Sequence, residues 1–336
     1  MVINEGVDKL FYCWARVSSG KPGVAEEFIS CKASDFWQIT GEERSYTDFV
    51  SKYYKPRGYI TVSLRSRRLY RYGVFELRTK LPKWDNGPIL WFGFESDDLF
   101  GGGCIHFSWF SGSGVLKANA GGFVSRVEID VTRYIPNNPS ENYNIFRIIH
   151  RRNMALYYIN DKLRAVALLA EGDTRDSKII YDKDPYIIGL TRDRPSARLG
   201  VLIDIDAGDI ERSYEWRDLH PWGLRVSETD PDTLITLDLY REGMKDPLRN
   251  TEAESSILTA PFPGLVNKAR IYLVATGSGR VVIQEYIDGD WSDYDSISFS
   301  GDKILRISIS EPGILHRLLI EPETKIFVKK GYVLLK

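Results

Sequence analysis

The sequence predicts an all-β protein built from two antiparallel sandwich domains. Its apolar segments are short, rich in β-branched and aromatic residues, and interrupted by Gly, Pro, Asn or Asp. This pattern of apolar segments is typical of strands and not of amphipathic helices. A chain of 336 residues that is 43% hydrophobic and 12% aromatic is also large enough for two cores.

The first series of expected strands ends before about residue 215. In chain order the strands are Tyr59 to Leu64, Gly73 to Leu81, Ile89 to Phe94, Ile105 to Phe110, Arg126 to Val131, Phe146 to His150, Ala155 to Ile159 and Tyr186 to Leu190. Such spacing suits a sandwich or jelly roll. We expect the larger sandwich over residues 25–215, preceded by an N-terminal strand or extension over residues 1–24.

A second series follows the charged stretch ERSYEWRDLHPWG, where Pro221 and Gly223 interrupt the alternation. Its expected strands are Leu234 to Tyr240, Ala269 to Ala275, Val281 to Tyr286, Ile304 to Ile309, Arg317 to Ile320 and Ile326 to Leu335. They predict a smaller, jelly-roll-like sandwich over residues 216–336.

The charge balance gives no general attraction to nucleic acid or to an anionic membrane. There are 45 Lys and Arg against 46 Asp and Glu, for a net charge of −1. The N-terminal MVINEGVDKLFYCW lacks the pattern of a signal peptide, and no 18-residue apolar run follows it. We therefore expect neither a signal peptide nor membrane insertion, and any electrostatic partner must be recognised locally.

The three cysteines, Cys13, Cys31 and Cys104, lie far from any metal-binding or CxxC spacing. Free buried thiols are the favoured interpretation. Cys13 and Cys31 could form a disulfide only if their strands adjoin. The low content of glutamine and methionine is expected where thermolabile side chains are avoided, which suggests a hot source.

Two segments carry a family resemblance. RYGVFELRTKLP followed by PILWFGFE lies within Tyr59 to Ser96, and FRIIHRRNMALYYINDKL spans Phe146 to Leu163. In this order they resemble the laminarinase-like members of glycoside hydrolase family 16, in the concanavalin A-like lectin/glucanase superfamily. The resemblance implies a concanavalin A-like antiparallel β-sandwich, a jelly roll with a concave sugar cleft.

That family carries Glu-x-Asp-x-Glu or a close variant on its next strand, with the acids pointing into the cleft. Alternate residues of a strand share a face, and a retaining mechanism needs two carboxyls about 5 to 5.5 Å apart. Here the matching strand, residues 104–110, reads CIHFSWF. Alternation directs Ile, Phe and Trp to the core and leaves Cys104, His106 and Ser108 on the concave face. We therefore expect a domain that lacks the catalytic carboxylates.

The alternative is a hydrolase with displaced catalytic residues. Glu128 and Asp130 begin like the family motif, but Arg133 stands where the second glutamate belongs. An ordinary strand with one charged face is the favoured interpretation. The enzyme hypothesis would use Glu128, Asp130 and His106, although His in a polar groove is as often a plain hydrogen-bonding residue.

Several side chains are candidates for ligand contact. In the resembled family, positions equivalent to Trp84 and Trp91 lie near the sugar cleft, where flat rings stack on sugars. Arg65, Arg67, Arg68 and Arg71 crowd one hairpin; they could bind an acidic glycan or protect a sheet edge. The residues expected to bind ligand are His106, Ser108, Trp84, Trp91, Arg71 and Glu128.

No cofactor is expected, with one alternative. Asp204, Asp206 and Asp209 alternate as oxygen ligands of a structural calcium ion could, although the full calcium-loop pattern is absent. In the second domain Tyr286, Trp291 and Tyr294 are weaker ligand candidates, for which a structural role is favoured.

Two functions follow. The preferred one is a non-catalytic carbohydrate-binding or structural assembly protein, with a glycan or other subunits as partners and no nucleic acid, able to form a homo-oligomer. The lack of an export pattern suggests a virion or particle surface, or the cytoplasm. The alternative is a laminarinase-like endo-β-glucanase with displaced catalytic residues.

Overall fold

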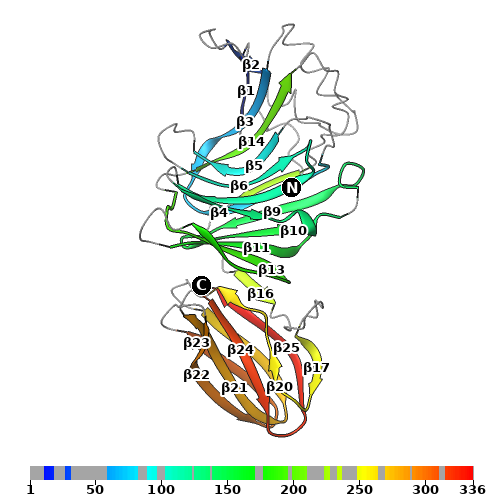
Figure 1. Ribbon diagram of the computed structural model, residues 1–336, viewed down its shortest axis with the longest axis vertical. Helices are drawn as coiled ribbons and strands as arrows, with labels where there is room; N and C mark the ends of the chain where they lie inside the picture. The colour runs from blue at the N-terminus through cyan, green and yellow to red at the C-terminus, as the bar shows by residue number, and fades with distance from the viewer. Residues whose placement is uncertain are drawn as a thin grey trace. The chain divides into compact units, whose positions relative to one another are not determined.

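The computed structural model confirms the all-β prediction: strands in antiparallel pairs build four sheets, two in each of two compact units (Figure 1). The structure describes residues 11–18, 27–31, 59–81, 89–96, 103–122, 125–136, 138–170, 177–195, 199–209, 223–227, 233–236, 248–263, 269–287, 290–309 and 315–335. Within these ranges the one helical element is the single 3-10 turn η1 (Thr132–Tyr134). For β1, β2, β15 and β16 the description is limited to the backbone.

The first unit comprises Met1–Tyr181 and Ile188–Asp230. Sheet I has the order β2-β1-β3-β14-β5-β6-β7-β8. Its strands are β1 (Phe11–Ser18), β2 (Glu27–Cys31), β3 (Tyr59–Tyr70), β5 (Ile89–Glu95), β6 (Cys104–Phe110), β7 (Val115–Gly121), β8 (Arg126–Asp130) and β14 (Leu199–Asp209). Sheet II has the order β12-β13-β11-β10-β9-β4-β15. Its strands are β4 (Gly73–Thr79), β9 (Asn144–His150), β10 (Met154–Ile159), β11 (Lys162–Leu169), β12 (Lys178–Lys183), β13 (Tyr186–Thr191) and β15 (Gly223–Ser227).

An aromatic core joins sheets I and II. Phe107 of β6 packs against Phe92 in its own sheet, with ring centroids 5.4 Å apart. From sheet II it meets Phe146 at 5.5 Å and Tyr157 at 5.2 Å, both edge to face. All four rings are fully buried. Aromatic pairs in such geometries contribute about 0.5 to 1.5 kcal/mol each beyond the area that they bury, so this cluster is a principal attachment between the two sheets.

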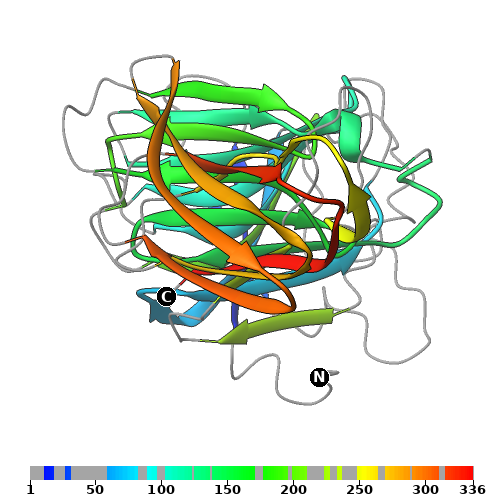
Figure 2. The same ribbon diagram turned by 90° about the horizontal axis from the view of Figure 1, so that it is seen from below.

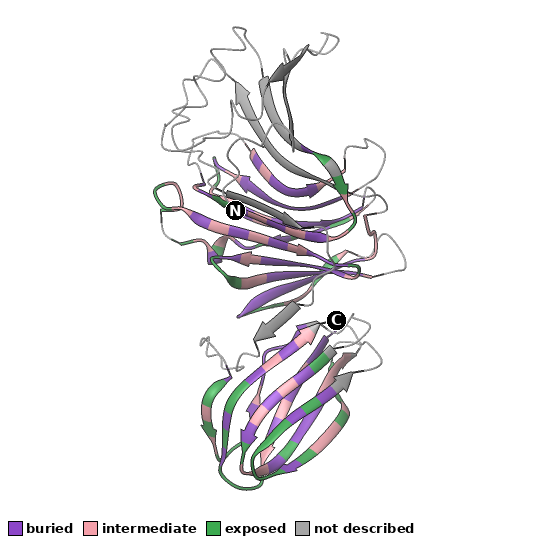
Figure 3. Cartoon of the chain, turned by 180° about the vertical axis from the view of Figure 1, so that it is seen from behind, coloured by how far each residue is buried: buried purple, intermediate pink, exposed green. Residues whose placement is uncertain are grey.

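The alternation that predicted the strands is visible in their burial (Figure 3). In β4 and β9 every second residue is buried, because successive side chains of a strand point to opposite faces. β6 departs from this pattern, since six of its seven residues are buried and both of its faces are covered.

The second unit comprises Asp182–Ile187 and Pro231–Lys336. Sheet III has the order β16-β25-β20-β23, with β17 also paired to β25; sheet IV has the order β18-β24-β21-β22, with β19 also paired to β24. The strands are β16 (Thr233–Thr236), β17 (Arg249–Ala253), β18 (Ile257–Leu258), β19 (Phe262–Pro263), β20 (Ala269–Thr276), β21 (Ser278–Ile287), β22 (Asp290–Ser300), β23 (Lys303–Ile309), β24 (Leu315–Pro322) and β25 (Ile326–Leu335). Figure 2 shows the long, twisted orange strands of sheet IV.

Two strand pairings assign the ends of the first unit. β15 pairs with β4, from Gly223 opposite Arg78 to Ser227 opposite Val74, so it belongs to the first unit and not to the second as expected. β1 pairs with β3 along its whole length, so this segment is part of sheet I.

Three further sequence-based expectations concern the pairing of two cysteines, an opening strand and a membrane-spanning helix. Cys13 lies directly opposite Cys31 in the register of β1 and β2, so their strands adjoin as a disulfide would require. The family resemblance also predicts an opening strand at Ser34 to Ile39, and this segment lies outside the described residues. Among the residues that are described, no helix has the length and hydropathy needed to span a membrane.

Candidate functional site

The candidate site lies on the face of sheet I that points away from the aromatic core. In β6 the core-facing residues are Ile105, Phe107 and Trp109, as predicted, and all are buried. Alternation therefore places Cys104, His106 and Ser108 on the opposite face. The residues of β5, β7 and β8 that lie beside these three side chains complete the site.

Strand register carries this outer face across four strands. Ser108 lies opposite Trp91 of β5 and opposite Lys117 of β7, and Lys117 lies opposite Asp130 of β8. Directly opposed residues share a face, so these side chains form one row across the sheet. The backbone of β14 extends the row, because Asp204 lies opposite Trp91.

A second row lies next to the first. His106 lies opposite Asn119 of β7, and Asn119 lies opposite Glu128 of β8. His106 and Glu128, which lie more than twenty positions apart in the sequence, are thereby brought onto one surface. The structure thus unites four of the predicted ligand-binding residues, which are Trp91, His106, Ser108 and Glu128.

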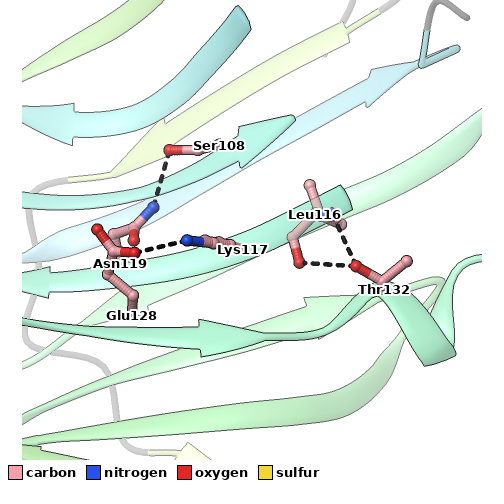
Figure 4. Close-up of polar contacts among 6 residues, drawn as sticks. All are labelled: Ser108, Leu116, Lys117, Asn119, Glu128 and Thr132. Atoms are coloured by element: carbon pink, nitrogen blue, oxygen red, sulfur yellow. Dashed lines mark hydrogen bonds and ion pairs between the residues drawn. The ribbon is translucent and has the colours of Figure 1, made fainter. Parts of the chain in front are cut away.

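Two polar contacts organise this surface (Figure 4). Asn119 donates a hydrogen bond from Nδ2 to Ser108 Oγ at 2.8 Å. Lys117 Nζ forms an ion pair with Glu128 Oε2 at 2.7 Å. At the end of the face, Leu116 N donates to Thr132 Oγ1 at 2.9 Å and so joins β7 to η1.

The two sides of the surface differ in accessibility. Cys104, His106 and Ser108 are no more than 4% exposed. The side chains of Lys117 and Glu128 are 33% and 48% exposed. A ligand on this face therefore meets Lys117, Glu128 and half-buried Trp91 first, whereas the β6 side chains and Asn119, which is 3% exposed, act mainly as buried support.

His106 is poorly suited to proton transfer. Desolvation by burial, reinforced by the positive charge of Arg126, lowers the pKa of His106 to about 3. Its Nδ1 lies 3.8 Å from Glu95 Oε2, beyond hydrogen-bonding distance, and has no hydrogen-bond partner among the described residues. The imidazole is therefore neutral near pH 7 and a weak base, which counts against the catalytic alternative.

The described carboxylates of the face do not complete the catalytic motif of the resembled glucanases. Glu128 and Asp130 lie two residues apart on β8 and share its outer face, but Thr132 and Arg133 stand where the second glutamate would follow. Glu128 is paired with Lys117, and Asp130 Oδ1 accepts a hydrogen bond from Thr132 N at 2.9 Å. Glu95 belongs to β5, three strands from β8, so the backbones of these two strands lie about 14 Å apart.

Other predicted residues lie elsewhere. Arg71 is exposed in the turn between β3 and β4, with its Cζ 5.5 Å from the centre of the Tyr72 ring. Trp84 lies outside the described residues, as do the side chains of the three aspartates proposed for calcium. Among the groups that are described, no cluster of three His, Cys, Asp or Glu could hold a metal ion, and the calcium site stays a prediction.

The sequence interpretation missed Lys117 and Asn119. Both lie on β7, whose sequence VLKANAG alternates polar and small apolar residues. That alternation is the signal of a half-polar strand. It does not reveal that β7 is the immediate neighbour of β6, which is the fact that makes these two residues part of the site.

Cys104 should be nearly inert in the folded protein. Burial raises the pKa of its thiol to about 12, so very little thiolate forms at pH 8. We expect native Cys104 to react with iodoacetamide at least about a thousandfold more slowly than an unshielded thiol. Peptide mapping after timed labelling measures this, and labelling in urea is the control that should restore the reaction. Rapid modification of Cys104 in the native protein would contradict its burial.

The comparisons with known proteins give only distant likenesses. No protein-family model matches the chain, and no curated protein matches it. Among solved structures, the β-glucanase of Bacillus licheniformis aligns with 63% of this chain and 86% of its own, at 11% identity and a TM-score of 0.33. A prokaryotic β-1,3-1,4-glucanase (lichenase) derived from a mouse hindgut metagenome aligns with 59% and 67%, at 12% identity and a TM-score of 0.30.

A third structure is the catalytic domain of an endo-1,3-β-glucanase (laminarinase) from Thermotoga petrophila RKU-1. It aligns with 62% of this chain and 71% of its own, at 12% identity and a TM-score of 0.29. Likenesses this distant do not bear on activity. The strand pairing described above defines the class: an all-β protein with an antiparallel β-sandwich and a second, smaller one.

Proposed function

We propose that this chain is a non-catalytic carbohydrate-binding protein whose ligand lies on the outer face of sheet I, over β7 and β8. The observation that carries the proposal is the composition of β6, where the cleft positions hold a thiol, an imidazole and a hydroxyl group in place of acids. Of the acids on this face, Glu128 is engaged by Lys117 at 2.7 Å, and Glu95 of β5 lies beside His106, 3.8 Å from its Nδ1. Among the described side chains, the positions of β6 that would carry the catalytic acids hold none, so the proposed activity is binding of a sugar and not its cleavage.

The chemistry of the face supports a sugar ligand. Sugar sites combine a flat aromatic surface with a few placed donors and acceptors. Here half-buried Trp91 lies in the same row as Lys117 and Asp130, and Asn119 and Glu128 follow in the next. Ammonium and carboxylate groups held in an ion pair are already oriented, so a sugar hydroxyl group can hydrogen-bond to the other carboxylate oxygen of Glu128 with little additional ordering.

The binding test compares two ion pairs of the same length. Binding of laminarin and lichenan oligosaccharides is measured by calorimetry for the natural chain and for the double variant Lys117→Ala, Glu128→Ala. We expect the variant to bind at least about tenfold more weakly, a loss of about 1.4 kcal/mol. The matched control is Glu252→Ala, Lys325→Ala, which removes a 2.7 Å ion pair from the second unit. Equal binding by the first variant, or no binding by the natural chain, would refute the proposed site.

The enzyme alternative has its own test. The chain is incubated with laminarin, lichenan, agarose and carrageenan, and reducing ends are counted. We expect no release above the buffer blank, since the strand that matches the catalytic strand of the resembled family holds no acid. Release that disappears in Glu128→Gln would replace our proposal with a laminarinase-like hydrolase.

A further inference from the structure

The outer face of sheet III is unusually basic. Its strands β17, β20, β23 and β25 carry the cations Arg249, Arg270, Lys303, Arg306, Lys329 and Lys330. Among them stands one acid, Glu252, and Lys325 already holds its carboxylate at 2.7 Å. With a net charge of −1 for the whole chain, this face is a local concentration of positive charge.

Register shows which side chains share this face. Tyr272 of β20 lies opposite Tyr332 of β25 and opposite Arg306 of β23. Val274 likewise lies between Lys330 and Ile304. The intervening residues of these strands are buried in the core of the unit, so both rows point outwards.

Arg270, Arg306 and Lys330 are exposed, and none of them forms an ion pair with a carboxylate that the structure describes. Ile304, beside them, is 60% exposed. Exposed apolar surface beside cations without an ion-pair partner is a feature of a binding surface, because apolar area gains free energy when it is buried and the cations attract and orient an anionic partner.

We propose that this face, formed by Arg270, Tyr272, Ile304, Arg306, Lys330 and Tyr332 and called the basic face below, binds an anionic polysaccharide bearing sulfate esters or uronate carboxylates. Guanidinium groups match the planar carboxylate and the sulfate through two parallel hydrogen bonds. Sugar rings supply apolar patches for Ile304 and for the tyrosine edges. The basic face and the face of sheet I are separate surfaces, so either assignment can fail without the other.

The tyrosines favour a glycan over a single-stranded nucleic acid. Stacking of bases requires free aromatic faces. Tyr272 and Tyr332 instead stack on each other, with centroids 4.9 Å apart and planes 19° apart. Lys330 Nζ lies 5.8 Å from the centre of the Tyr332 ring. The ring edges and hydroxyl groups are left for the ligand, and they suit hydrogen bonding to sugar hydroxyls better than stacking on bases.

The test uses the full chain and heparin, a sulfated uronate polysaccharide, with affinity measured by calorimetry at two salt concentrations. We expect heparin binding that weakens as salt rises, and at least a tenfold loss in Arg270→Gln, Arg306→Gln. The control Arg280→Gln, Lys183→Gln removes the same charge from exposed positions outside the basic face and should change affinity by no more than about twofold. Near-ultraviolet circular dichroism checks that each variant is folded.

Three results would overturn the inference: no heparin binding by the natural chain, equal affinity in Arg270→Gln, Arg306→Gln, or tighter binding of an oligothymidine than of heparin. The double variant of Lys117 and Glu128 serves as a second control and should retain full heparin affinity. The heparin affinity of this double variant distinguishes a failure of this inference from a failure of the proposed sugar site on sheet I.

Discussion

Acidification from pH 7 to pH 4 is expected to destabilise the protein strongly, because three buried histidines resist protonation. Desolvation lowers the pKa of His106 and His150 to about 3 and that of His316 to about 4. His150 packs against Tyr72 and Phe94, with ring centroids 5.4 and 5.7 Å away. An imidazolium in such surroundings would lose its hydration without gaining a counter-charge.

The direction of the effect follows from linkage. In the unfolded chain each histidine takes up a proton near pH 6.5, but in the folded chain it does so only near pH 3 to 4. The unfolded state therefore binds more protons below pH 6.5, and stability falls with pH until the folded pKa is reached. At pH 4 the loss is on the order of 3 kcal/mol for each histidine, which together is comparable with the whole stability of many proteins.

The measurement is the free energy of unfolding in urea between pH 7.5 and pH 4. The variant His316→Phe removes one titrating group from a site where neither ring nitrogen has a hydrogen-bond partner among the described residues. We expect it to remove about a third of the histidine contribution to the pH dependence. A pH profile identical to that of the natural chain would show that His316 does not contribute.

Replacing Phe107 by alanine should destabilise the protein by about 3 to 5 kcal/mol. Phe107 is fully buried and contacts Phe92 in its own sheet and Phe146 and Tyr157 in the other. The substitution leaves a cavity at the junction of sheets I and II that these rings cannot close without breaking their own contacts.

Urea unfolding at pH 7.5 measures the effect, with two controls. Phe107→Leu keeps much of the volume and should lose clearly less. Leu69→Ala changes a side chain that is 45% exposed and should cost less than about 1 kcal/mol. A loss below about 1 kcal/mol in Phe107→Ala would mean that the two sheets are held together by other contacts.

Local pattern predicted most strands closely. Ile326 to Leu335 was expected as a strand and is observed with those bounds as β25, and the expected strand from Ala269 differs from β20 by one residue. β22 was missed, because its sequence DWSDYDSISFS is polar and its aspartates are rare in strands. It pairs along its length with β21, and this long-range pairing overrides its weak local preference.

By itself the sequence determined that the protein is all-β, that β6 presents its apolar residues to the core, and that no acid occupies the opposite positions. These properties depend on composition and on the two-residue period of a strand, which are local. Only the tertiary structure decided that Lys117 and Asn119 lie beside Ser108 and His106, that β15 returns to the first unit, and that both faces of β6 are buried. Strand order and register arise from contacts between distant segments, so no pattern within a single segment contains them.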